Sequence, residues 1–115
     1  MPLLKLHVNQ TVDAKIKEEI LGELSKQVVD AIGKPEKYMM VLFEESTLMM
    51  GGDSQVAAFA EVRSIGGLTP DVNRLISERV CGILADSLHI APDRIYINFI
   101  DIARTHWGWN RSTFG

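Results

Sequence analysis

The sequence has few features that would place it in a disulfide, metal or membrane class. It contains one cysteine in 115 residues, Cys81, which excludes an internal disulfide, a Cys-x-x-Cys redox pair and a thiolate zinc site. Cys81 lies in an apolar helical pattern, so we expect it to pack in the core. No apolar run approaches the ~20 residues of a membrane span, and no signal-peptide pattern opens the chain. We expect a cytoplasmic protein with no membrane partner; export without a signal peptide stays open.

The chain also lacks an excess of positive charge. The formal net charge is −3 with both signs mixed, whereas a nucleic-acid surface would need a basic stripe with aromatic residues between the charges. The histidines at positions 7, 89 and 106 have no metal-ligand spacing, and no phosphate-binding glycine motif precedes a helix. We therefore expect no nucleic-acid partner, no metal and no organic cofactor.

Two helical patterns alternate with four strand-like runs. Strands are predicted at residues 3–8, 38–43, 56–63 and 95–100, and helices at 12–32 and 69–88. Apolar residues recur every four positions along the first helix, which is one helical face, and Gly33 ends it. The second helix opens with Thr69 as a hydroxyl cap and Pro70 in its first turn.

The two halves of the chain follow one plan. Pro35-Glu36-Lys37 and Pro92-Asp93-Arg94 each stand between a helix and a strand. Two β-α-β units predict an α/β (α+β) fold with a four-stranded sheet and two helices on one face. We expect one domain over 1–115, with pseudo-repeats of about 1–52 and 55–102 and a tail at 103–115.

The runs 38–43 and 95–100 are apolar at nearly every position, which a half-solvated sheet does not tolerate. The bare face of the sheet is therefore expected to be covered by other copies in a closed assembly. Three copies would let each sheet wall a central barrel, and composition alone is also compatible with a dimer.

Pro2 is the candidate for chemistry. Once Met1 is removed, Pro2 carries a secondary amine held by its own ring. An apolar pocket beside a cation would lower the pKa of that amine toward the working pH of a general base. The alternative is a terminus that frays into solvent, but the strand at 3–8 follows at once and would hold the amine in place.

Six short motifs, spread from one end of the chain to the other, carry a family resemblance. They are Met1-Pro2, Gly33-Lys34-Pro35, Ser64-Ile65-Gly66, Asn73-Arg74, the run 92–98 and the run 108–114. Together the motifs resemble the macrophage migration inhibitory factor family, within the tautomerase superfamily that uses an amino-terminal proline. The resemblance implies a homotrimer with active sites at subunit boundaries, and keto–enol tautomerisation of phenylpyruvate-like arylpyruvates and of D-dopachrome-like compounds.

The resemblance also implies a set of site residues. Pro2 matches the catalytic base, and Lys34 and the backbone of Ile65 match groups that hold the acid of the substrate. Further substrate-binding positions are Tyr96 and Asn98 from an adjacent subunit, the aromatic walls Trp109 and Phe114, and Trp107, which stands where a small aliphatic residue is usual. Each residue alone has a packing or capping explanation; together with the terminal proline they favour the site.

The resulting hypothesis is an isomerase in which Pro2 moves a proton between carbon and oxygen. One alternative is a cytokine-like or partner-binding protein of the same fold with a vestigial pocket, and another is a small ligand-binding regulatory module. The Cys-x-x-Cys of animal members is replaced by Ala57-Ala58-Phe59-Ala60. That replacement excludes a thiol oxidoreductase.

Overall fold

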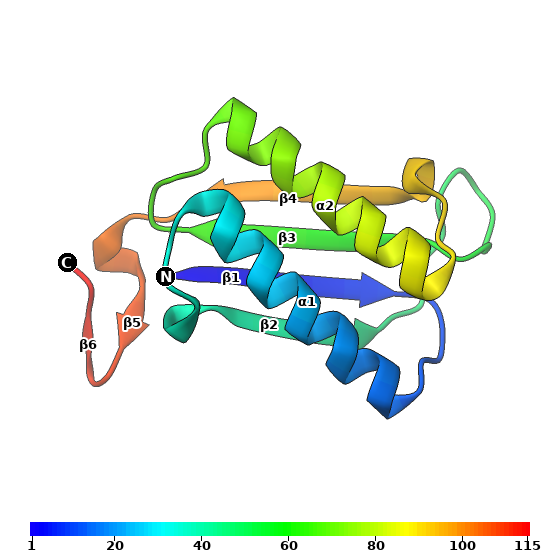
Figure 1. The fold of residues 1–115 in the computed structure, drawn as a ribbon, viewed down its shortest axis with the longest axis horizontal. Coiled ribbons are helices and arrows are strands. Elements are labelled where there is room, and N and C mark those ends of the chain that lie inside the picture. The colour runs from blue at the N-terminus through cyan, green and yellow to red at the C-terminus, as the bar shows by residue number, and fades with distance from the viewer.

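A four-stranded sheet in the order β2-β1-β3-β4 is the frame of the computed structural model, which describes residues 1–115 (Figure 1). Its strands are β1 (Pro2–Val8), β2 (Met40–Glu45), β3 (Ala58–Ser64) and β4 (Ile95–Asp101). The helices α1 (Ala14–Ile32) and α2 (Pro70–Leu88) lie side by side on one face of this sheet. The predicted fold class, with two helices on one face of a four-stranded sheet, is confirmed.

Each half of the chain is a strand, a helix and a parallel strand. β1 pairs with β2 and β3 pairs with β4 in parallel, and the halves join through the antiparallel pair β1–β3. In this register Pro2 lies opposite Ser64, and Ser64 lies opposite Asp101. The loops that follow β3 and β4 therefore meet at the chain's N-terminus.

The core lies between the sheet and the helices. Alternate residues of β1 and β3 are buried, and Ile20, Leu24 and Ile76 on the helices are at most 1% exposed. Apolar residues recur at every second position in the strands and at about every fourth position in the helices, so their side chains meet in a common layer. Cys81 is half-buried against this cluster, as predicted.

Capping residues end the helices where the sequence indicates. Gly33 adopts a left-handed conformation with φ of 82°, and its N–H donates to Val29 O. The hydroxyl of Thr69 accepts a hydrogen bond of 3.2 Å from the N–H of Val72. Gly67, with φ of 84°, passes so close to α1 that a Cβ there would lie 2.8 Å from Cγ2 of Ile32.

Two predicted strand boundaries are wrong by two residues. β2 begins at Met40 and not at Tyr38, because Glu36–Tyr38 form a 3-10 turn in which Met39 N–H donates to Glu36 O at 2.9 Å. Pro35, just before the turn, has the fixed φ of proline and adopts extended backbone. β3 begins at Ala58 and not at residue 56.

The late start of β3 has its own cause. The carbonyl of Val56 accepts a hydrogen bond from Nε of Arg94 at 3.0 Å, and the N–H of Ala57 donates to Oδ1 of Asn9 at 2.8 Å. Side chains therefore take the backbone groups that a longer strand would use for pairing.

The face of the sheet that carries no helix has both apolar and charged side chains. On this face, the edge strand β2 carries Met40 and Leu42, and the edge strand β4 carries Tyr96 and Ile100. On the central strands Lys5 lies opposite Glu61, and Arg63 reaches Glu61 at 3.5 Å. Charged side chains therefore stand among apolar ones on the bare face, including Glu44 on the edge strand β2.

The tail folds back on its own chain. β5 (Gly108–Trp109) and β6 (Ser112–Thr113) form a hairpin beside the start of β1 (Figure 1). Its turn residues Asn110 and Arg111 both have positive φ, of 50° and 65°. This is the backbone that a two-residue hairpin turn of type I′ requires.

Neither α1 nor α2 combines the length and the apolar character of a membrane-crossing helix.

The core gives a direct test of the fold. Ile20→Ala removes a side chain that is 1% exposed, so its free energy of unfolding should fall by about 2–5 kcal/mol. Ile16→Ala makes the same change one turn earlier, at a residue that is 39% exposed, and should cost less than about 1 kcal/mol. Urea denaturation of both variants measures the difference; equal losses would contradict the placement of α1.

Candidate functional site

Three adjoining hollows surround the N-terminal end of β1. The first has a volume of about 220 Å³ and is lined by Met1, Lys34, Ile65, Arg104 and Phe114. The second, of about 460 Å³, shares Met1 and Phe114 with the first and has mostly apolar walls: Leu3, Lys37, Tyr38, Met39, Met40, Trp107, Gly108 and Trp109. The third, of about 300 Å³, shares Leu3, Trp107 and Gly108 with the second and adds Arg63, Ile102 and His106.

The N-terminal amine lies where the first two hollows meet. Met1 lines both, and Pro2 beneath it is fully buried at the first position of β1. With Met1 attached, the nitrogen of Pro2 is an amide and the basic group is the amine of Met1. Burial, and second the positive charge of Lys34, lower the pKa of that amine from its ordinary value.

Lys34 is positioned by the end of α1. It follows the left-handed Gly33, and its own N–H donates to Val29 O at 3.0 Å. Its ammonium donates to the carbonyl of Ile65 at 2.5 Å. Burial lowers the pKa of Lys34; the carboxylate of Asp101 opposes that shift, and the positive charge of Arg104 adds to it.

The loop after β3 is held by a chain of hydrogen bonds. The hydroxyl of Ser64, which is fully buried, donates to the carbonyl of Gly66 at 2.8 Å. The N–H of Gly66 donates to Oδ1 of Asp101 at 2.8 Å. These bonds hold the carbonyl of Ile65 against the ammonium of Lys34, so the loop and the end of α1 form one continuous wall.

Aromatic side chains form the opposite wall. Trp109 and Phe114 stack with ring centroids 5.3 Å apart, and Tyr38 meets both rings edge-on at 5.6 and 6.2 Å. Such edge-to-face and stacked contacts are the geometry that aromatic rings prefer. The hairpin therefore packs against the 3-10 turn before β2 through Tyr38. The three rings give the second hollow a flat, apolar face.

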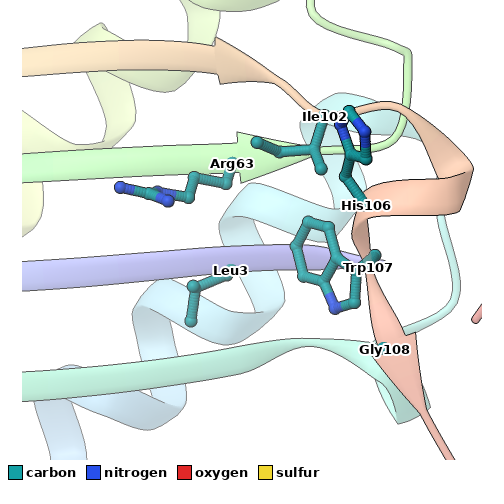
Figure 2. A pocket seen from close by; sticks show the side chains of 6 residues that line it. All are labelled: Leu3, Arg63, Ile102, His106, Trp107 and Gly108. Carbon is teal, nitrogen blue, oxygen red and sulfur yellow. The ribbon is translucent and has the colours of Figure 1, made fainter.

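Trp107 separates the second hollow from the third. Figure 2 shows its ring beside Leu3, with Ile102 and His106 beyond it. The guanidinium of Arg63 points along its strand away from Trp107, toward the carboxylate of Glu61. Because the indole lines both hollows, it takes up space that a smaller side chain at position 107 would leave open.

The structure gathers six of the eight predicted site residues and leaves two apart. Pro2, Lys34, Ile65, Trp107, Trp109 and Phe114 all lie in or beneath the three hollows. Tyr96 and Asn98 lie exposed on β4, five and three residues before Asp101. At 3.3 Å per residue these are about 16 and about 10 Å along the strand from the level of Pro2.

Sequence patterns alone did not single out several residues of the hollows. Arg104 and Ile102 lie in the irregular segment after β4. The sequence places Leu3 and Arg63 in strands, with nothing to mark them as site residues. An exposed arginine outside a motif carries no periodic or spacing signal. Only the meeting of the loops after β3 and β4 brings Arg104 beside Lys34.

The arrangement combines a weakly basic amine, cations and a flat apolar wall. An ammonium and a guanidinium can hold an anionic group, and the aromatic rings can hold a flat one. An amine whose pKa is lowered can take up a proton near neutral pH. No three histidine, cysteine, aspartate or glutamate side chains gather in a way that would hold a metal ion.

Comparison with known proteins gives one consistent family. The sequence profile of the family described as macrophage migration inhibitory factor (MIF) matches residues 1–115. The chain is 40% identical to macrophage migration inhibitory factor of Rattus norvegicus over 115 residues, 99% of each protein. Its fold resembles the crystal structure of the homologue from Prochlorococcus marinus, with a TM-score of 0.93, 37% identity and coverage of 98% and 99%. The macrophage migration inhibitory factor of Toxoplasma gondii gives a TM-score of 0.94 at 28% identity, with coverage of 96% and 98%.

The electrostatics of the amine can be tested directly. Lys34→Gln removes the positive charge that disfavours the protonated amine, so the pKa of the N-terminal amine should rise. Because burial remains, the pKa should stay below its ordinary value. The pH dependence of the chemical shifts of residue 1, followed by NMR, measures it. Lys26→Gln, on an exposed position of α1, is the matched control; an equal rise there, or no rise in Lys34→Gln, would contradict the coupling.

Proposed function

The chain belongs to the macrophage migration inhibitory factor family, and from that premise we propose that it is an isomerase. The proposed reaction is the keto–enol tautomerisation of phenylpyruvate-like arylpyruvates, and possible substrates include D-dopachrome-like compounds. Pro2 serves as the general base once Met1 has been removed. No metal or organic cofactor takes part.

One observation carries the proposal: the amine at the N-terminus lies in a walled site where its pKa is lowered. Burial and Lys34 act on the amine of Met1 in the structure. Removal of Met1 would take away a residue that lines two hollows and would turn the buried nitrogen of Pro2 into a secondary amine at the same place. The same two causes would then favour its free-base form.

The chemistry needs one base and one place for negative charge. In the proposed step the lone pair of the Pro2 nitrogen takes a proton from the carbon beside the carbonyl of the substrate. The electrons of that C–H bond form the carbon–carbon double bond, and the carbonyl electrons pass to the oxygen as an enolate. The protonated Pro2 amine then gives that same proton to the enolate oxygen, which completes the enol and restores the free base, and the reverse sequence restores the ketone.

The walls suit a flat acid. The carboxylate of an arylpyruvate would face the ammonium of Lys34, which is held by the carbonyl of Ile65. Its ring would lie in the second hollow against Trp107, Trp109 and Phe114. A positive group at one end and apolar walls at the other orient the substrate so that the carbon to be deprotonated faces the amine.

We further propose that the working form is a homotrimer in which Tyr96 and Asn98 reach the site of an adjacent subunit. Within one chain these side chains lie on the bare face of β4, away from the level of Pro2. Tyr96 is 64% exposed and Met40 is 63% exposed, and both lie on edge strands. Apolar edges that are covered by a neighbour would remove this exposed surface from water.

The base assignment predicts a loss of turnover. Pro2→Gly keeps a small second residue, so Met1 is still removed, but it replaces the rigid secondary amine with a primary one. The value of kcat/KM for phenylpyruvate should fall by at least about a hundredfold. An ultraviolet assay of enol–keto conversion measures the rate, and circular dichroism shows that the fold persists.

Pro92→Gly is the control for this variant, because it removes a proline from the turn before β4, outside the three hollows. It should turn over phenylpyruvate at the wild-type rate. A wild-type rate in Pro2→Gly would refute the base assignment, and a wild-type protein with no turnover would favour the partner-binding alternative.

The shared site predicts complementation between two inactive variants. Pro2→Gly and Tyr96→Ala should each be inactive alone, yet mixing them by joint unfolding and refolding should restore part of the activity. A mixed assembly contains sites where Pro2 of one chain meets Tyr96 of another. Sedimentation equilibrium of the mixture should show three chains of 12.8 kDa.

Pro2→Gly mixed with Lys34→Gln is the matched control. Pro2 and Lys34 act within one chain, so no mixed site regains both, and the mixture should be no more active than the two variants measured separately. Recovery in this control, or none in the first mixture, would contradict a site that borrows Tyr96 from a neighbour.

A further inference from the structure

Arg104 has no partner of its own. Its guanidinium makes no side-chain hydrogen bond, ion pair or cation–π contact, whereas Arg63, Arg74, Arg79 and Arg94 each pair with a carboxylate. Arg104 lines the hollow of about 220 Å³ that also holds Lys34. Arg111, which also lacks a carboxylate partner, lines none of the three hollows.

The first hollow has an excess of positive charge. Lys34, Arg104 and the N-terminal amine surround it, and Asp101 is the one carboxylate that acts on Lys34 there. One oxygen of Asp101 already accepts the N–H of Gly66. Burial is the main cause that lowers the pKa of Lys34, Asp101 opposes it, and the positive charge of Arg104 adds a smaller lowering. Two cations that line one hollow repel each other, so a bound anion would relieve that repulsion.

The backbone fixes where the guanidinium begins. Arg104 opens the 3-10 turn Arg104–His106, in which the N–H of His106 donates to Ala103 O at 2.9 Å. Just before it, the N–H of Ile102 donates to the carbonyl of Ser64 at 2.9 Å. The turn is thus tied to the loop that carries Ile65, and the root of Arg104 keeps its place at the mouth of the hollow.

We propose that Arg104 is the second cation of the acid subsite: it holds the carboxylate of the ligand together with Lys34 and makes the site select anionic over neutral ligands. The inference rests on the proposed function and adds its selectivity. A guanidinium presents two parallel N–H groups to the two oxygens of a carboxylate, and an ammonium adds a single point of contact. Lys34 alone would attract an anion without fixing its plane.

The walls of the hollow strengthen this pair of contacts. Ile65 and Phe114, which stay in place after Met1 is removed, line the same space as Arg104. Charges act more strongly where water is excluded than on an open surface, where an ion pair contributes little. Arg104 is itself exposed, and it differs from the other surface arginines because it lines a hollow together with Ile65 and Phe114.

The test measures binding without turnover. The probes are 3-phenylpropionate and its neutral amide, 3-phenylpropanamide, bound to the wild-type protein after Met1 removal and followed by calorimetry or NMR titration. Arg104→Gln should weaken binding of the acid about tenfold or more and leave binding of the amide within twofold. Arg104→Lys should recover part of the loss, because it keeps the charge without the two parallel donors.

Arg74→Gln is the matched control, since Arg74 is exposed on α2 and pairs with Asp71 of the same helix. It should bind the acid as the wild type does. The proposal is overturned if Arg104→Gln binds the acid as well as the wild type, if acid and amide weaken equally, or if the wild type prefers the amide or binds neither. Turnover of phenylpyruvate is read separately, so a wild type that selects the acid but does not isomerise phenylpyruvate would contradict the proposed function and leave the role of Arg104 standing.

Discussion

The placement of β1 between two partners is the constraint on which the site depends. Its backbone is paired with β3 on one side from Pro2 onward and with β2 on the other side from Leu3 onward. A terminus usually frays because nothing offsets the entropy of ordering it. Here the alternate burial of Pro2, Leu4, Leu6 and Val8 in the core offsets that cost. The result is that Pro2, at the start of β1, has a fixed position in the fold.

The surroundings of the amine come from three loops that the sheet brings to one end. The C-terminus of α1 supplies Lys34, the loop after β3 supplies Ile65, and the segment after β4 supplies Arg104 and the hairpin. None of these groups is near the amine in sequence. The antiparallel pairing of β1 with β3, and the parallel pairing of β3 with β4, place the ends of both later strands at the level of Pro2. Topology, more than any single contact, thus decides which cations act on the amine.

Much of the fold could be predicted because apolar residues recur at regular intervals along its helices and strands. The stripes of α1 and α2, the glycine after α1 and the hydroxyl cap of α2 all follow from local chemistry. The strand boundaries were harder, since Tyr38 is apolar enough for a strand yet is held in a 3-10 turn, and Val56 gives its carbonyl to Arg94. The fold-back of the tail over Tyr38 depends on ring packing between distant segments, which leaves no pattern in the sequence. The position of Arg104 beside Lys34 could not be predicted either, because it depends on β3 and β4 ending at the same edge of the sheet.

The duplicated plan of the chain has a further consequence at the far end of the sheet. The counterpart of β1 in the second half is β3, but β3 begins with an internal peptide bond, and its approach is fastened by Asn9 and Arg94 through Ala57 N–H and Val56 O. Repetition of the strand-helix-strand unit therefore doubles the number of strands in the sheet, but it does not provide a second N-terminal amine. The chain carries one such nitrogen, and an assembly of these chains can gain more only by adding whole subunits.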